Sequence, residues 1–309
     1  NQERIFQLAA ADAILQRERE QQQRDVTHAL FSTNFSFHPF MKMKKKLILK
    51  RLGFDDEDKR RNLISMCLFG EKAMYTNGAV QNAKLRRLVY PDWDLRFYVD
   101  ENVSNEIVEA LLREKAQVVI YRSLPGRAGQ LMRFLPLADH KGEIVIVRDC
   151  DSRLNPRERV AVREFEQSKD KQFHLMYEHM HPKNTVFGGM FGVRGVIPKI
   201  RDEIEKCLND GDACEKYGDD MLFLDRVLLP MMSDSNTMKH GEGKGAEKML
   251  PYRDKVYQGY VGQVILCNCP HELYAGKGCG HATRKVPCSV ATLVHSSPKV
   301  LFHLGKFLG

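Results

Sequence analysis

Asp149 and Asp151 stand two residues apart, directly after an apolar run at 144–147. The run predicts a buried strand, so both carboxylates follow its carboxyl end and can converge on one divalent cation. Oxygen ligands suit Mg²⁺ or Mn²⁺, and such an ion can bridge two phosphates and stabilise them as a leaving group. The alternative is a loop in which the aspartates cap the backbone and form surface ion pairs.

Two arginines and a histidine are candidates to complete a metal and phosphate site around this pair. Arg148 and Arg153 flank the carboxylates, where they could neutralise phosphate or hold the acids in place. His240 lies in a glycine-rich stretch at 233–246, which we expect to be a loop, and it could be a third metal ligand. Because a histidine in a loop is more often solvated, both interpretations stay open for His240.

Two segments further along the chain could approach the same site. Gly188 and Gly189 follow a predicted strand, and paired glycines allow the backbone to come close to a ligand. The alternative for this pair is a tight turn in the core. Asp219 and Asp220 open an apolar helix, where a carboxylate is either an N-cap or a catalytic group close to an acceptor.

The elements that must position these residues alternate between strands and helices. Apolar runs predict strands at 63–69, 95–99, 118–121, 144–147 and 173–176, and amphipathic runs predict helices at 77–88, 105–114, 130–135 and 221–229. Such alternation indicates a Rossmann-like α/β fold with a mostly parallel sheet, which binds ligands at the carboxyl ends of its strands. We expect this domain at 62–265, between an N-terminal extension (1–61) and a C-terminal tail (266–309).

The run Arg148–Glu158 (RDCDSRLNPRE) resembles the RD-x-DSR-x-x-x-RE signature of a family of nucleotide-sugar glycosyltransferase-like proteins from bacteria, large DNA viruses and protists. Other blocks match in the same order: Leu68-Phe69-Gly70, Pro91-Asp92-Trp93, Arg96–Asp100, His174-Leu175-Met176, Gly188–Gly192 and Asp220–Leu224. The resemblance covers residues 63–265, about two-thirds of the chain.

The resemblance implies a type-A glycosyltransferase fold, with a nucleotide half and an acceptor half. It implies Mn²⁺ and the sugar diphosphate at Asp149 and Asp151, and an acceptor close to Asp220. It implies a nucleoside beside Leu68, Phe69, Tyr75 and Asp100, and a donor sugar beside Gly189 and Met190. The sequence departs from the family at Met221, which replaces Gln in a DQ-x-FL pattern, and at Phe191, which replaces Trp in GGMWG.

Both extensions carry residues that could bind further partners. The N-terminal one holds six basic residues that are either an exposed tether or an arm for RNA or an acidic protein: Lys42, Lys44, Lys45, Lys46, Lys50 and Arg51. The tail holds six soft-metal ligands, more than the four that a structural Zn²⁺ needs: Cys267, Cys269, His271, Cys279, His281 and Cys288. The alternative for the tail is a set of free thiols, since no C-x₂-C pair is present.

Composition excludes several classes of protein but does not identify the function. The 309 residues are 43% hydrophobic and 28% charged, which excludes collagen-like, mostly disordered and disulfide-framework proteins. The net charge of +8 favours anionic partners such as nucleotides or nucleic acids. The uneven spacing of the eight cysteines favours a reducing compartment, either the cytoplasm or an organellar matrix. No apolar run is long enough to span a membrane.

The sequence is consistent with two functions. The first is a metal-dependent glycosyltransferase that moves a sugar from a nucleotide-sugar, such as a UDP-sugar, to an acceptor. The second is a catalytically silent subunit of a larger assembly, such as a ribonucleoprotein, that binds RNA or protein through its basic extensions. The replacement of Gln by Met221 beside Asp220 motivates the second, because it removes a polar group from the expected site.

Overall fold

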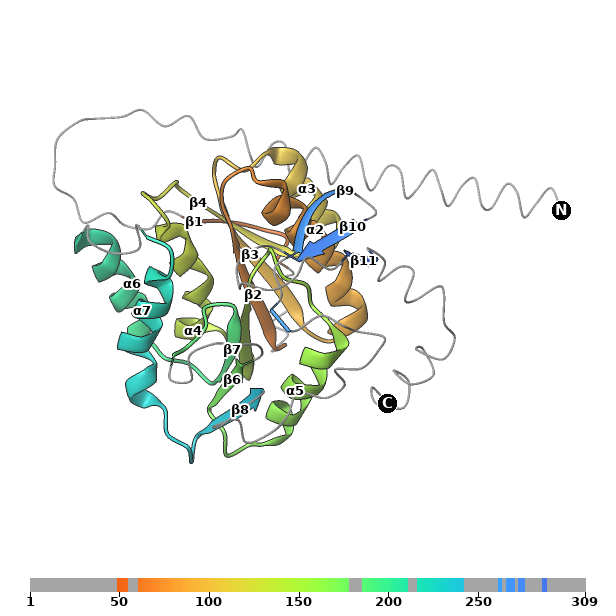
Figure 1. Cartoon of the computed structure of the whole chain (residues 1–309). Coiled ribbons are helices and arrows are strands. Elements are labelled where there is room, and N and C mark those ends of the chain that lie inside the picture. The colour runs from red at the N-terminus through yellow and green to blue at the C-terminus, as the bar shows by residue number, and fades with distance from the viewer. Residues whose placement is uncertain are drawn as a thin grey trace, which may run out of the picture. The chain divides into compact units, whose positions relative to one another are not determined.

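A computed structural model describes residues 49–54, 61–177, 185–210, 216–241, 261–262, 265–269, 272–275 and 285–287. Its largest feature is an eight-stranded sheet with the order β1-β4-β3-β2-β5-β7-β6-β8 (Figure 1). The strands are β1 (Leu49–Leu52), β2 (Leu63–Leu68), β3 (Asp94–Asp100), β4 (Gln117–Tyr121), β5 (Ile144–Arg148), β6 (Phe173–Tyr177), β7 (Met190–Arg194) and β8 (Thr237–Gly241).

The strand directions confirm a mixed α/β fold with a mostly parallel sheet. Six strands run one way, whereas β1 and β7 run the other. Every residue of β2 and β5 is buried, as expected for central strands that are covered on both faces. Because β7 is antiparallel to β5, the start of β7 lies at the same edge of the sheet as the end of β5.

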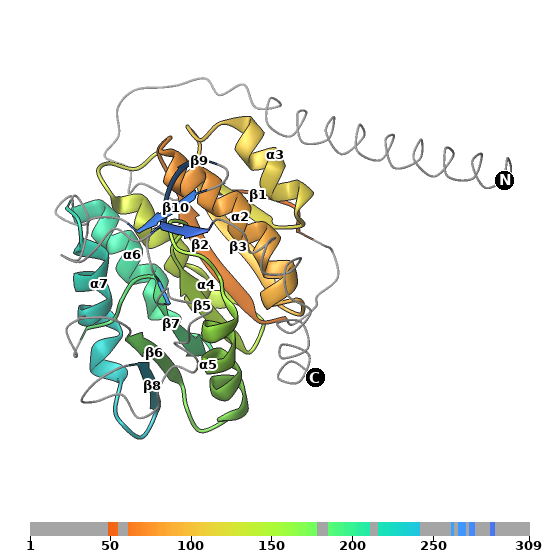
Figure 2. The same ribbon diagram turned by 45° about the vertical axis from the view of Figure 1, so that its right-hand side comes forward.

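Helices cover both faces of the sheet (Figures 1 and 2). One face carries α2 (Ala73–Val89), α3 (Asn105–Arg113) and α5 (Pro156–Gln167); the other carries the 3₁₀ helix η1 (Ala128–Phe134), α4 (Pro136–Asp139), α6 (Lys199–Asp210), α7 (Asp219–Val227) and the short η2 (Leu229–Met231). On the second face, the Phe134 ring of η1 lies 5.8 Å from Phe191 of β7 and 6.1 Å from Phe223 of α7. These rings join η1 and α7 to the sheet in one apolar core.

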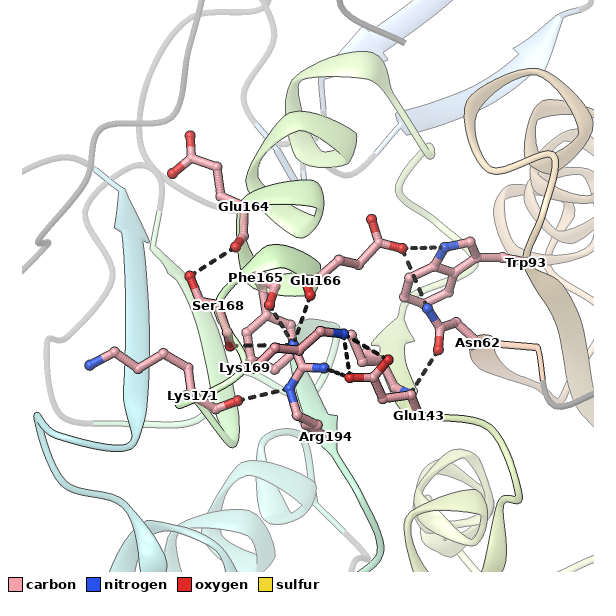
Figure 3. Close-up of polar contacts among 11 residues, drawn as sticks. Asn62, Trp93, Glu143, Glu164, Phe165, Glu166, Ser168, Lys169, Lys171 and Arg194 are labelled. Carbon is pink, nitrogen blue, oxygen red and sulfur yellow. Dashed lines mark hydrogen bonds and ion pairs between the residues drawn. The ribbon is translucent and has the colours of Figure 1, made fainter. Parts of the chain in front are cut away.

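A polar network fixes the end of α5 at the edge of the sheet where β2 and β5 begin (Figure 3). Arg194 donates to three backbone carbonyls at the end of α5: Phe165 (2.6 Å), Glu166 (3.3 Å) and Ser168 (3.4 Å). A cation at this end satisfies carbonyls that have no partner within the helix. The Glu166 carboxylate also accepts from Trp93 Nε1 (3.0 Å) and Asn62 Nδ2 (3.4 Å). The opposite, carboxyl edge of the sheet holds the candidate site.

The N-terminal boundary lies earlier than the sequence predicted. Residues 49–52 fall within the predicted extension, yet they form β1, which pairs with β4 and completes the sheet. Lys50 and Arg51 therefore belong to an edge strand, and the Arg51 guanidinium lies 4.7 Å from the centre of the Phe54 ring. The other four basic residues of the predicted arm, at 42 and 44–46, lie outside the described residues.

The described part of the tail forms a second sheet with the order β11-β10-β9. Its antiparallel strands are β9 (Ile265–Cys269), β10 (Glu272–Ala275) and β11 (Lys285–Pro287). Cys267 and Cys269 fall on β9, whose side chains are not described, and the other four predicted zinc ligands lie outside the described residues. The zinc site thus stays a prediction. None of the described helices is both long and apolar enough to cross a membrane.

Candidate active site

A buried arginine, Arg133, joins two carboxylates at the carboxyl edge of the sheet. Its Nη1 is paired with Asp149 Oδ1, and its Nη2 lies 2.6 Å from Asp220 Oδ2. The side chain of Arg133 is 6% exposed and that of Asp220 is 9% exposed, whereas that of Asp149 is 42% exposed. Arg133 and Asp220 are thus buried, and Asp149 is the member of the three that solvent reaches.

Arg133 reaches this position from η1. The backbone carbonyl of Arg133 accepts a hydrogen bond of 2.7 Å from Ser65 Oγ on β2, which holds the helix against the sheet. Burial lowers the pKa of Arg133, but the charges of Asp149 and Asp220 outweigh that effect and raise it above its ordinary value. The guanidinium therefore stays charged between the two acids.

Gly188 and Gly189 leave no room for a side chain, because the carboxylates of Asp220 and Asp149 occupy the space where a Cβ would lie. A Cβ on Gly189 would lie within 3.0 Å of the Asp149 carboxylate, and one on Gly188 would lie equally close to Asp220 Oδ2 and Arg133 Nη2. The pair thus lies in a tight segment before β7 that packs against both carboxylates, and its close approach to a ligand stays a prediction.

Asp151 adds a third carboxylate to this edge. Burial, and then the charge of Asp149, raise the pKa of Asp151 from 3.8 to about 7. Tyr75, in the first turn of α2, lies near the same group, since burial and the charge of Asp151 raise the pKa of its phenol. Asp149, Asp151 and Asp220 thus gather around Arg133, and a further cation beside Asp149 and Asp151 would offset their mutual repulsion.

The donor set fits a hard divalent ion held by few protein ligands. Asp149 and Asp151 supply carboxylate oxygens, which Mg²⁺ and Mn²⁺ prefer. No group of three or more His, Cys, Asp or Glu side chains among the described residues gathers closely enough to hold a metal. The remaining coordination positions would therefore go to water and to phosphate oxygens of a bound nucleotide, as is common for Mg²⁺.

The raised pKa of Asp151 predicts a stability effect in the metal-free protein. Above pH 7 the folded state holds an ionised, poorly solvated Asp151, and this penalty shrinks as the pH falls from 7 towards 4, because the folded group takes up its proton before the unfolded one does. With EDTA present, Asp151→Asn should therefore raise Tm by about 2–4 °C at pH 8 and by much less at pH 4. Thermal unfolding followed by circular dichroism, with the exposed Asp92→Asn as control, measures this; equal shifts at both pH values would contradict it.

The two arginines that flank Asp149 and Asp151 have structural partners. Arg148 is 2% exposed, pairs with Glu158 of α5 at 3.2 Å, and donates to the carbonyls of Val147 and Phe191. Its strand position turns Arg148 to the α5 face, so the structure does not bring it to the carboxylate pair, and phosphate binding by Arg148 stays a prediction. Arg153 donates to the carbonyls of Cys150 (3.1 Å) and Ser152 (2.9 Å), so it holds the loop that carries the carboxylates.

His240 also lies elsewhere than predicted. It belongs to β8, not to a loop, and is fully buried. Its Nδ1 lies 2.9 Å from His174 Nε2, and its Nε2 lies 3.3 Å from Glu164 Oε2. Since β7 and β6 separate β8 from β5, about 14 Å of sheet lies between His240 and the strand that leads to Asp149. The structure thus does not bring His240 to the carboxylate pair.

The remaining predicted residues fall into two groups. Phe69 and Tyr75 are half-buried near the end of β2 and in α2, on the side of the carboxyl edge. Three others have interior or backbone partners: Leu68 is buried, Asp100 accepts from the Asn102 N–H (2.9 Å), and Met190 packs among Ala161, Met176 and Val261. The Asp219 carboxylate accepts from the Lys216 N–H at 2.7 Å, so it fixes the turn before α7.

Three residues of η1 and the turn before it complete the site, and the sequence pattern did not predict them. They are Arg127, Gln130 and Arg133. With its amide oriented to match its neighbours, Gln130 donates to Asp220 Oδ1 (3.3 Å) and accepts from Arg127 Nη1 (3.1 Å). A lone Arg133 within the apolar run 131–135 was the available signal, since an arginine is rarely buried unless it is paired.

Comparisons with known proteins describe the fold only. No protein-family model and no curated protein matches the sequence. Among solved structures, a glycosyltransferase involved in glycosylation of the major capsid of PBCV-1 is 11% identical, with a TM-score of 0.39 over 59% of this chain and 81% of that one. The 4-diphosphocytidyl-2C-methyl-D-erythritol synthase of Anaerococcus prevotii is 10% identical (TM-score 0.39, 62% and 93%).

A third structure is glucosyl-3-phosphoglycerate synthase of Mycobacterium tuberculosis in complex with Mn²⁺, UDP and phosphoglyceric acid. It is 15% identical, with a TM-score of 0.37 over 75% of this chain and 89% of that one. At such identities the function has to be argued from the residues of this chain.

Proposed function

We propose that this chain is a glycosyltransferase that uses a nucleotide-sugar donor and a divalent cation. The observation that carries the proposal is the convergence of Asp149, Asp151 and Asp220 on one edge of the sheet, where Arg133 is paired with Asp149 and Asp220 and the charge of Asp149 acts on Asp151. The resemblance of the run at 148–158 to nucleotide-sugar glycosyltransferase-like proteins predicts the same residues.

Asp149 and Asp151 would hold Mn²⁺ or Mg²⁺. When bound, the ion supplies positive charge that offsets the charge developing on the departing nucleoside diphosphate. Arg133 fixes the carboxylate of Asp149 and restricts its motion, which keeps the site preorganised. Gly188 and Gly189 leave open the space that the carboxylates and a donor sugar need.

Asp220 is the carboxylate best placed to act on the acceptor. It is held by Arg133 and Gln130 at the start of α7, so its oxygens keep a fixed position. If the reaction inverts the anomeric configuration, Asp220 would accept the proton of the attacking hydroxyl. A retaining reaction needs no separate base, and Asp220 would then orient the substrate.

Calorimetric titration of UDP into the full chain tests the proposal. We expect UDP to bind with Mn²⁺ present and not with EDTA. Asp149→Asn/Asp151→Asn should weaken this binding by at least about 100-fold, the upper limit for loss of an outer-shell metal partner. The control Asp92→Asn/Asp170→Asn changes the net charge equally at two exposed positions and should bind UDP like the wild type.

Failure of the well-folded wild type to bind UDP with either metal would contradict the proposal for UDP-sugars. Titration with GDP, ADP and CDP would then extend the test to other nucleotide-sugars. Failure with all four would leave the alternative of a silent assembly subunit, which the basic residues at 42–46 motivate.

A further inference from the structure

Tyr217 is an exposed aromatic residue beside the candidate active site. Its side chain is 84% exposed, the highest value among the large hydrophobic residues that the structure describes. It lies two residues before α7, the helix that carries Asp220. A single exposed apolar residue is common on protein surfaces, so the interest of Tyr217 lies in its position beside the carboxylates of the candidate site.

The ring is fixed although it is exposed. The Arg127 guanidinium lies 5.2 Å from the centre of the Tyr217 ring. Gly218 follows with a φ of +92°, a left-handed conformation that favours glycine, and the Asp219 carboxylate closes the turn on the Lys216 N–H. A ligand that packs on a ring already held in place loses less conformational entropy on binding.

Two hydrogen bonds connect this ring to the candidate reaction centre. Arg127 donates to Gln130, and Gln130 donates to Asp220 Oδ1. Asp220 is in turn paired with Arg133, which is paired with Asp149. Tyr217 also lies within electrostatic reach of Asp149, Asp151 and Tyr75, so its ring faces the centre of the site, next to the helix that carries Asp220.

The surrounding chemistry selects the class of ligand. The C–H-bearing face of a sugar ring packs on an aromatic ring, while its hydroxyls donate to carboxylates such as Asp219 and Asp220. A nucleic acid could also stack on the ring, but its phosphates would meet the nearby carboxylates without the cation that the donor diphosphate shares with them. We propose that Tyr217 is the platform for a carbohydrate acceptor; this inference rests on the proposed function.

Saturation-transfer NMR on the full chain with UDP and Mn²⁺ tests the platform. The probes are the methyl glycosides of glucose, galactose, mannose and N-acetylglucosamine, together with lactose. At least one should bind, and Tyr217→Ala and Tyr217→Ser should weaken that binding about 5- to 10-fold, as expected for one aromatic contact. Tyr217→Phe and the distant exposed control Leu88→Ala should stay within about twofold of the wild type.

The calorimetric affinity for UDP with Mn²⁺ separates the two proposals. A platform for the acceptor leaves it the same in the wild type and all four variants, whereas a loss of UDP affinity in Tyr217→Ala would assign the ring to the donor and overturn the acceptor inference. If UDP binds but no saccharide does, or if Tyr217→Ala binds saccharide like the wild type, the acceptor inference is wrong while the proposed function stands. A 12-nucleotide RNA that binds through Tyr217 would overturn the carbohydrate class. Absence of UDP binding would overturn both.

Discussion

Methionine in place of Arg133 should lower the free energy of unfolding by about 3–5 kcal/mol, the range for removing one partner of a buried ion pair. The change keeps the length and apolar part of the side chain but leaves Asp220, 9% exposed, without its guanidinium partner. Arg133→Lys should restore only part of the loss, because an ammonium cannot contact both carboxylates in the geometry of the planar group. Urea denaturation followed by circular dichroism measures all three proteins.

A matched control distinguishes the buried bridge from arginine loss in general. Arg113→Met removes an exposed helix ion pair with Glu109 and should cost about 0.5 kcal/mol or less. Adding Asp220→Asn to Arg133→Met should recover part of the lost stability, because it removes the unpaired charge. If Arg133→Met costs no more than Arg113→Met, the pairing with Asp149 and Asp220 does not hold this region together.

Alanine in place of Gly189 should weaken metal-dependent UDP binding about 100-fold, with a much smaller effect on stability. The new Cβ would overlap the Asp149 carboxylate, which is the end of a half-exposed side chain and can move aside. The fold thus tolerates the change, but a displacement of about 1 Å at a reacting group is enough for a loss of this size. Calorimetry with UDP and Mn²⁺ gives the affinity, and thermal unfolding gives the stability.

Gly192→Ala is the matched control for this prediction. Gly192 lies three residues further along the chain, within β7, and its added Cβ would meet a methyl group of Ile146 at 3.0 Å, away from the carboxylates. It should lower stability modestly and leave UDP binding unchanged. Equal affinities in Gly189→Ala and the wild type would mean that Asp149 does not contribute to nucleotide binding in its present position.

The pattern of apolar runs was sufficient to predict the parallel half of the fold. The runs that became β2, β3, β4 and β5 are short, continuous and separated by amphipathic stretches, which is typical of buried parallel strands. The antiparallel β7 was not predicted, because its sequence Met190–Arg194 adjoins a glycine pair and contains Gly192. Glycine weakens a strand pattern even where tertiary packing forms the strand.

Half of the candidate site could be predicted from the sequence. Asp149, Asp151 and Asp220 follow or begin elements that the pattern placed correctly, so their location at one edge followed from the fold class. The position of Arg133 could not be predicted in this way, because Arg148 is the arginine that adjoins Asp149 in the sequence. Alternate residues of a strand face opposite sides, so Arg148 points to α5 while the Asp149 carboxylate meets Arg133 from η1.

His240 lies in a segment whose glycine content led to a wrong prediction of its secondary structure. The stretch 233–246 contains three glycines and was interpreted as a loop, but residues 237–241 pair in parallel register with β6. Long-range pairing decided the conformation there, and one sequence carries no direct record of such pairing. The same pairing placed His240 beside His174, a partner 66 residues away that no local pattern indicates.

The two ion pairs of Arg133 differ in sequence separation, and this difference affects the order in which the candidate site forms. Arg133 and Asp149 are 16 residues apart, whereas Asp220 is 87 residues from Arg133. During synthesis, the first ion pair can form as soon as β2, η1 and β5 have emerged, but the second must wait for β6, β7 and α7. Contacts of such long sequence separation form late in folding. Pairing of Asp220 with Arg133 during refolding should therefore lag behind pairing of Asp149 with Arg133.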